Sequence, residues 1–136
     1  MSIGLLSLQM SARILVIDDN PVNLELARYL LGIAGYVVET AGDAEHALEL
    51  LKQATPDLIL VDLSLPGMDG LTLTRKLKAD ERLKSIPVAA FTASAMVGDE
   101  QRALQAGCAG YVTKPIDIDQ FTKQVAAFLQ DTTDPG

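Results

Sequence analysis

The chain has 136 residues, the length of one domain, and 49% of them are hydrophobic but only 4% aromatic, so an aliphatic core is expected. The formal charge of −7 and the pI near 4.5 argue against nucleic-acid binding, which needs a basic surface to neutralise phosphates. The single cysteine, Cys108, excludes an internal disulfide and indicates a reducing cytoplasm as the compartment.

We expect three parts: a loosely ordered extension at residues 1–10, the domain at residues 11–130, and a frayed tail at residues 131–136. The extension has no basic region and no long apolar run, so it predicts neither a secretory signal nor a membrane span.

A short, apolar, β-branched run at residues 13–17 predicts a buried strand, and two acidic residues follow it.

Asn20 and Pro21 then predict the start of a helix, because proline at the first helical position loses no hydrogen bond. Apolar residues at helical spacing continue this helix until Gly35. Residues 36–39 predict a shorter strand nearer an edge, and Asp43 caps a second helix.

The central strand is predicted at residues 57–61, an almost unbroken apolar run that suits a strand buried on both faces. It ends on Asp62, placed where the hydrophobic segment stops and just before a Pro-Gly turn. Ligands of open α/β sheets bind at the carboxyl ends of central strands, so Asp62 is the first candidate for chemistry. By position alone, Asp62 fits a simple loop cap equally well.

The rest of the chain predicts a weaker helix at residues 70–79, a strand at 87–91, a helix at 98–106, a strand at 109–112 and a helix at 117–129. The helix at 98–106 has a thin apolar face, so we expect it to be loosely packed and mobile. The apolar face of the last helix is predicted to consist of Ile118, Phe121, Val125, Phe128 and Leu129.

Strand and helix thus alternate five times with short connections. This pattern predicts an α/β fold, a doubly wound five-stranded parallel sheet with right-handed crossovers, for which we expect the strand order 2-1-3-4-5. In that order the strands that end at Asp19, Asp62 and Thr92 and the strand that leads to Lys114 all end at one edge of the sheet.

Three carboxylates are predicted to meet at this edge, those of Asp18, Asp19 and Asp62. Two such charges roughly 4 Å apart repel by about 4 kcal/mol at an effective dielectric near 20, so a cation must offset them. An all-oxygen site with room for water suits Mg²⁺, and Mn²⁺ fits the same ligands. We expect Asp19, Asp62 and a backbone carbonyl near Ser64 to bind the ion directly and Asp18 to bind it through water. Taken alone, the acidic pair also fits a helix cap.

With the ion bound, Asp62 is expected to attack a phosphoryl group and form an acyl phosphate. Lys114 supplies a second positive charge and the Thr92 hydroxyl donates to a phosphoryl oxygen, since phosphoryl transfer needs positioning and charge neutralisation above all. His46 lies in the middle of a predicted helix, away from this edge, and is expected to be a surface or packing residue.

Four motifs resemble the receiver domain of two-component response regulators: D-D-N at 18–20, V-D-L-S-L-P-G-M-D-G at 61–70, F-T-A at 91–93 and Y-V-T-K-P at 111–115. The resemblance runs from residue 13 to about residue 129 and implies a flavodoxin-like, CheY-like receiver fold. The sequence around D-N-P-V-N at 19–23 and the S-A-M at 94–96 are most similar to those of stand-alone receivers and of receivers attached to hybrid histidine kinases.

The resemblance also implies a role for each matching residue. Asp62 would be the phosphoacceptor, carrying a 4-aspartylphosphate, and Ser64 and Ser94 would occupy positions that tune its lifetime. The other implied roles are the acidic metal pair Asp18 and Asp19, the phosphate-contacting Lys114, the switch residues Thr92 and Tyr111, and a cis bond before Pro115.

The function implied is a phosphorylation-controlled binding module, which takes its phosphoryl group from a histidine kinase or a histidine phosphotransfer protein. Such a module catalyses its own phosphorylation and dephosphorylation and is not a turnover enzyme. It would bind its output partner through the fourth helix, fifth strand and fifth helix, as a cytoplasmic monomer or weak dimer with no nucleic acid or membrane partner.

Three other functions are weighed against this hypothesis. An aspartyl-phosphate hydrolase characteristically has a second acid two residues after its nucleophile, where this chain has Ser64. A flavodoxin-like cofactor carrier would have a loop rich in Ser, Thr and Gly after its first strand, where this chain is acidic. A degenerate receiver that serves only as a scaffold is disfavoured because all the expected site residues are present.

Overall fold

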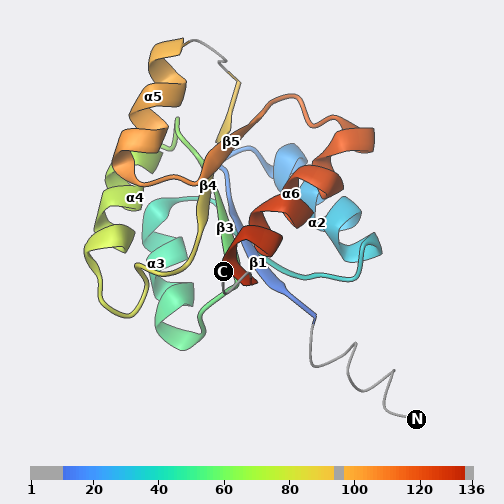
Figure 1. Cartoon of the computed structure of the whole chain (residues 1–136), viewed down its shortest axis with the longest axis horizontal. Coiled ribbons are helices and arrows are strands. Elements are labelled where there is room, and N and C mark those ends of the chain that lie inside the picture. The colour runs from blue at the N-terminus through green and yellow to red at the C-terminus, as the bar shows by residue number, and fades with distance from the viewer. Residues whose placement is uncertain (1–10, 94–96, 134–136) are drawn as a thin grey trace.

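A computed structural model of the chain describes residues 11–93 and 97–133 (Figure 1). Within these residues strands and helices alternate along the chain, as the sequence predicted. The elements are β1 (Arg13–Ile17), α2 (Pro21–Ile33), β2 (Val37–Ala41), α3 (Ala44–Gln53), β3 (Leu58–Asp62), α4 (Gly70–Ala79), β4 (Val88–Thr92), α5 (Val97–Ala106), β5 (Gly110–Thr113) and α6 (Ile118–Thr133). The expectations for residues 1–10, Ser94 and residues 134–136 fall outside the described residues.

The five strands form one parallel sheet in the order β2-β1-β3-β4-β5, which confirms the predicted topology. β3 is the middle strand, between β1 and β4, and every one of its residues is buried. β2 is an edge strand with only its last residue buried. Because all five strands are parallel, their carboxyl ends lie at the same edge of the sheet.

Helices cover both faces of this sheet (Figure 1): α3, α4 and α5 lie on one side, and α2 and α6 lie on the other. Strand side chains alternate between two apolar clusters, so that Ile59 and Val61 join the α3–α5 side whereas Leu58 and Leu60 join the α2–α6 side. Phe91 and Phe121 stack in the second cluster with their ring centroids 6.1 Å apart. A central strand buried on both faces is therefore held rigidly, and so is the carboxylate at its end.

Short polar residues begin α2 and α3. The Asn20 side chain accepts the backbone N–H of Val22 at 2.9 Å, and the Asp43 side chain accepts that of His46 at 2.7 Å. The side chain of His46 is exposed, as expected. α2 ends before Gly35, whose φ of +99° is a conformation that other residues rarely adopt.

Some expectations need correction. The second strand lies at Val37–Ala41 rather than 36–39, because β2 pairs with β1 in register as far as Ile17 and Ala41. α6 continues to Thr133, beyond the predicted end at residue 129. Ile118 is 63% exposed and does not join the core face of α6, of which it is the first residue.

The thin apolar face of α5 is confirmed: among its described side chains only Ala103 and Ala106 are buried, and Leu104 is 48% exposed. Its predicted mobility remains a prediction.

In the part of the chain that the structure describes, no helix has both the length and the apolar character that crossing a bilayer requires.

Candidate functional site

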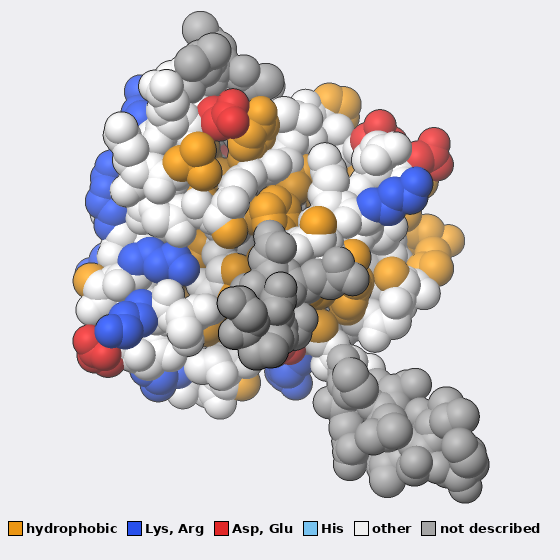
Figure 2. Space-filling model, viewed as in Figure 1, with side chains coloured by type: hydrophobic (Ala, Val, Ile, Leu, Met, Phe, Trp, Pro, Cys, Tyr) orange, Lys and Arg blue, Asp and Glu red, His pale blue; other side chains and the backbone are white. Residues whose placement is uncertain are grey.

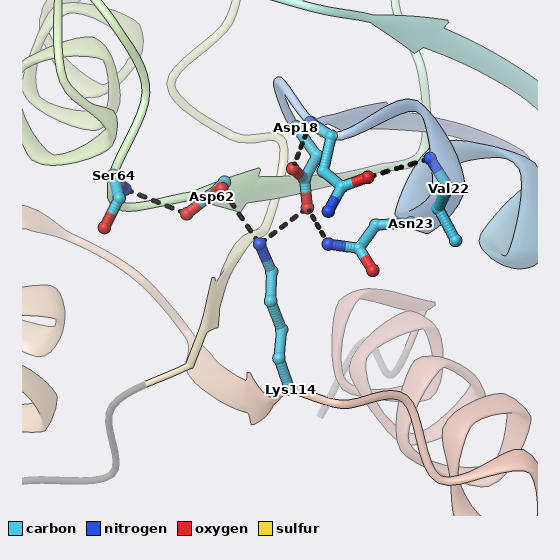
Figure 3. Close-up of polar contacts among 7 residues, drawn as sticks. Asp18, Val22, Asn23, Asp62, Ser64 and Lys114 are labelled. Carbon is cyan, nitrogen blue, oxygen red and sulfur yellow. Dashed lines mark hydrogen bonds and ion pairs between the residues drawn. The ribbon is translucent and has the colours of Figure 1, made fainter.

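The predicted site residues gather at the carboxyl edge of the sheet (Figure 3). Asp18 follows β1, Asp62 ends β3, and Lys114 follows β5, so three strands deliver them. Thr92 ends β4, the strand between β3 and β5. The order of the strands thus brings side chains from distant parts of the sequence to one place.

Asp18 is fully buried, yet both of its carboxylate oxygens have donors. Oδ1 accepts the backbone N–H of Asn20 at 2.9 Å. Oδ2 accepts the side-chain amide of Asn23 at 3.2 Å and lies 2.7 Å from the ammonium of Lys114. A buried carboxylate is costly unless it is paired and hydrogen-bonded, so these contacts fix its orientation.

Asp62 is only 4% exposed and is also held from two directions. Its Oδ1 accepts the backbone N–H of Ser64 at 2.8 Å, and its Oδ2 accepts a hydrogen bond from Lys114 Nζ at 2.9 Å. α4 begins against the end of β3: a Cβ added to Gly70 would lie 2.3 Å from the Asp62 backbone oxygen. Only glycine fits this close approach, and it keeps the loop after Asp62 compact.

Lys114 connects the two buried carboxylates, since its ammonium contacts both. Burial by itself lowers the pKa of Lys114, but the hydrogen bonds and negative charges of Asp18 and Asp62 outweigh burial and raise the pKa above its usual value. The ammonium also lies 5.0 Å from the centre of the Phe91 ring. The backbone N–H of Lys114 bonds the Thr92 carbonyl at 2.7 Å, and the Lys114–Pro115 bond is cis, as the resemblance implied.

Asp18, Asp19 and Asp62 each offer a carboxylate oxygen, and these three oxygens lie within 4.8 Å of one another. Asp19 is exposed, whereas the other two are buried. Three hard oxygen donors that open to solvent on one side fit Mg²⁺, which keeps several waters when bound. Ser64 touches this cluster through its backbone N–H. The predicted role of a carbonyl near Ser64 remains a prediction.

The two predicted switch residues lie on neighbouring strands. Thr92 is 8% exposed at the end of β4, and Tyr111 is half-buried on β5, packed against the apolar cluster of the α3–α5 side. A hydrogen bond to the Glu100 carboxylate on α5, together with the charge of that carboxylate, raises the pKa of Tyr111. Tyr111 is therefore in contact with α5, the helix that the sequence predicts to be mobile.

Sequence reasoning missed Asn23. Its amide donates to the Asp18 oxygen that also contacts Lys114. The signal available was its position in the first turn of α2, three residues after Asn20, where a helical side chain turns back toward the preceding strand end.

Known proteins resemble this chain in sequence and in fold. Residues 14–126 match the family model of the response regulator receiver domain. The chain is 41% identical over 122 residues to the polar-differentiation response regulator DivK of Brucella ovis, covering 90% of this chain and 99% of the relative.

Solved structures of similar proteins share the fold. The receiver domain of a signal transduction histidine kinase from Syntrophus aciditrophicus is 30% identical with a TM-score of 0.82, covering 93% of this chain and 96% of that one. The receiver domain of the sensor histidine kinase PA1611 from Pseudomonas aeruginosa is 32% identical with a TM-score of 0.80, covering 88% and 98%. That structure holds a magnesium ion in its active-site cleft.

Proposed function

The chain belongs to the response regulator receiver domain family, the signalling switches of phosphorelays, and from this premise we propose that Asp62 is its phosphoacceptor. The donor is a phosphohistidine of a histidine kinase or of a histidine phosphotransfer protein. The observation that carries the proposal is the contact of Lys114 with both Asp62 and Asp18, because it puts a cation beside the carboxylate that would receive the phosphoryl group.

In the transfer, an Asp62 oxygen forms a bond to phosphorus while the bond from phosphorus to the histidine nitrogen breaks, and the imidazole leaves with the electron pair. Lys114 stabilises the negative charge on the phosphoryl oxygens, and the Thr92 hydroxyl donates a hydrogen bond to one of them. These groups belong to the protein itself, so the module promotes its own phosphorylation and the later attack of water. It does not turn over an external substrate.

Asp18, Asp19 and Asp62 would hold Mg²⁺, or Mn²⁺ in its place, with a backbone carbonyl near Ser64 as a further ligand. The cluster of three carboxylate oxygens within 4.8 Å supports this assignment. When bound, the ion supplies charge neutralisation for the phosphoryl oxygens. Asn20 and Asn23 keep the Asp18 carboxylate in position.

The output is a shift between two packings of the protein. A phosphoryl group on Asp62 adds negative charge and acceptor oxygens, and Thr92 turns to bond one of them. Tyr111 then moves inward, which changes the surface formed by α5, β5 and α6 that binds the output partner. If Tyr111→Ala leaves partner affinity as responsive to phosphorylation as in the wild type, the aromatic step is wrong.

For the compartment, the oligomeric state and the partners, the proposal follows what the family resemblance implies. We expect the protein to act in the cytoplasm as a monomer or a weak dimer, with protein partners and without nucleic acid. The net charge of −7 supports the last point.

The test is intact-mass spectrometry after incubation with Mg²⁺ and phosphoramidate. We expect one phosphoryl adduct, absent in Asp62→Asn and absent with a chelator. Asp80→Asn, which removes a carboxylate from the loop after α4, is the matched control and should keep the adduct. An adduct that persists in Asp62→Asn would refute the assignment.

A further inference from the structure

The ring of Phe91 lies next to the ammonium of Lys114, and the roles proposed above leave this contact without a function. Lys114 Nζ lies over the ring, 5.0 Å from its centre, within the distance of about 6 Å at which a ring face attracts a cation. Phe91 is fully buried on β4 and is the register partner of Asp62 on β3. The ring therefore meets the ammonium from the buried side of the site, beside the proposed phosphoacceptor.

The strength of this contact depends on how far water is excluded from it. Figure 2 shows Lys and Arg side chains gathered on the outer flank formed by α3, α4 and α5, where water screens their charges. The lysine side chains of two surface ion pairs, Lys52 and Lys84, are 69% and 51% exposed, whereas that of Lys114 is 14% exposed. A ring face attracts a desolvated ammonium more strongly than an exposed one, so the contact of Lys114 is of the stronger kind.

The Phe91 ring is itself held in place from two directions. Phe121 of α6, also fully buried, stacks against it with the ring centroids 6.1 Å apart and an angle of 23° between the ring planes. β4 lies between β3 and β5, and Phe91 is in register with a residue of each neighbour. Phe91 is thus a fixed surface, whereas the ammonium of Lys114 stands at the end of a flexible stem.

Phosphoryl transfer changes the charged partners of Lys114. Before transfer, its ammonium lies 2.7 Å from Asp18 Oδ2 and 2.9 Å from Asp62 Oδ2. When an oxygen of Asp62 bonds to phosphorus, negative charge moves from the carboxylate to the phosphoryl oxygens, and the ammonium has to follow it. The Phe91 ring takes no part in this redistribution of charge, so its attraction for the ammonium is the same before and after transfer.

A packing role is the alternative explanation for Phe91, since it belongs to the apolar cluster on the α2–α6 side of the sheet. The two roles require different properties of the ring. Packing requires its volume, whereas attraction of a cation requires the negative charge on its face. Fluorine substituents withdraw electron density from the ring face and change the volume little, so they distinguish the two roles.

We propose that Phe91 is a positioning residue for phosphoryl transfer to Asp62, because its ring face holds the Lys114 ammonium where the phosphoryl oxygens arrive. The inference rests on the proposed role of Asp62. Phe91 forms no bond in the reaction and acts only through Lys114. Phe121 supports the ring from α6.

The test replaces Phe91 in the full chain with phenylalanines that carry one, two or three ring fluorines. The measurement is the initial rate of adduct formation with phosphoramidate at fixed Mg²⁺. We expect the rate to fall with each added fluorine, to about three- to ten-fold below the wild type with three, the size expected for loss of a largely buried contact between a cation and a ring. The matched control is the same series at Phe128, which packs against the same apolar cluster beside Gly110 and should leave the rate unchanged.

An NMR measurement reads the position of the ammonium without any phosphorylation. Protons over the face of an aromatic ring are shifted upfield, so the ε-methylene protons of Lys114 should resonate upfield of those of Lys52 and Lys84. Phe91→Leu keeps an apolar side chain but removes the ring, so the upfield shift should be lost. Unfolding midpoints of all variants identify any general loss of structure.

A rate that falls in Phe91→Leu but does not follow the number of fluorines would show that only the volume of the ring matters, and would overturn the proposal. A wild-type Lys114 without the upfield shift would overturn it as well. A wild type that phosphoramidate fails to label at Asp62 would refute the proposed function and the positioning role with it. Normal labelling of Asp62 that is independent of fluorine at Phe91 would refute only the role of Phe91.

Discussion

Replacing Lys114 with methionine separates electrostatic from packing roles in the site. The substitution keeps an apolar chain of similar length but removes the ammonium that lies 2.7 Å from Asp18 and 2.9 Å from Asp62. Three carboxylates within 4.8 Å of one another are then left without their cation. The variant should therefore lose stability, and a divalent ion should return most of it.

The expected loss follows from the distances. At 4.8 Å and an effective dielectric of about 20, each pair of carboxylates repels by roughly 3.5 kcal/mol. Removing one partner of a buried ion pair typically costs 3–5 kcal/mol, and the open side of this site places the loss near the low end, at about 3 kcal/mol. Domains of this size are stable by about 5–15 kcal/mol, so Lys114→Met should still fold.

Urea denaturation of wild type and variant, with chelator and with saturating Mg²⁺, measures both quantities. With chelator, a loss of about 3 kcal/mol at a slope near 1.5 kcal/mol per molar lowers the midpoint by about 2 M. With Mg²⁺ the loss should shrink to about half or less, because the ion replaces the lost charge. Lys84→Met, at an exposed ion pair, should cost less than about 0.5 kcal/mol in either buffer. Equal losses of Lys114→Met in both buffers would refute the electrostatic explanation.

The pH dependence gives an independent check. Although burial opposes it, the two carboxylates raise the pKa of Lys114 in the folded protein above its unfolded value. Its stabilising contribution is therefore complete below the unfolded pKa, near 10.5, and is lost as the pH rises through the folded value. Between chelated samples, the stability advantage of wild type over Lys114→Met should fall over this alkaline range. An advantage that stays constant there would contradict the assigned direction.

Three further predictions follow from single contacts. Asn23→Ala removes a hydrogen bond to the Asp18 carboxylate, so Mg²⁺ affinity measured by calorimetry should fall about three- to ten-fold; unchanged affinity would exclude a positioning role. Gly70→Ala forces a Cβ to 2.3 Å from the Asp62 backbone oxygen, so it should lower the free energy of unfolding by about 2 kcal/mol or more. In the control Gly32→Ala, the new Cβ has no other atom within 4 Å, so the change should stabilise α2 by about 0.5–1 kcal/mol. Burial raises the pKa of the Cys108 thiol, so a thiol reagent should label native protein far more slowly than unfolded protein, and fast labelling of the native state would show an exposed thiol.

The sequence by itself determined the type of nearly every element. Residues 58–61 are a continuous apolar run that is too short for a helix. Asn20 and Asp43 are helix caps, and their side chains accept hydrogen bonds from backbone N–H groups only two or three residues along the chain. Such signals are readable because propensity, capping and periodicity depend on near neighbours. The alternation of strands and helices then limited the topology, and with it the edge at which the acidic residues lie.

Only the tertiary structure decided which atoms meet. Lys114 reaches Asp62 across 52 positions of sequence, and its simultaneous contact with Asp18 depends on how β1, β3 and β5 are placed. The same holds for the amide of Asn23 on Asp18 and for the pocket that Arg102 of α5 lines together with Thr92 of β4. These contacts are set by strand register and by the packing of helices on the sheet, and both minimise the free energy of the whole core. No stretch of sequence carries that information alone, so side-chain partners within the site emerge only when the layers are assembled.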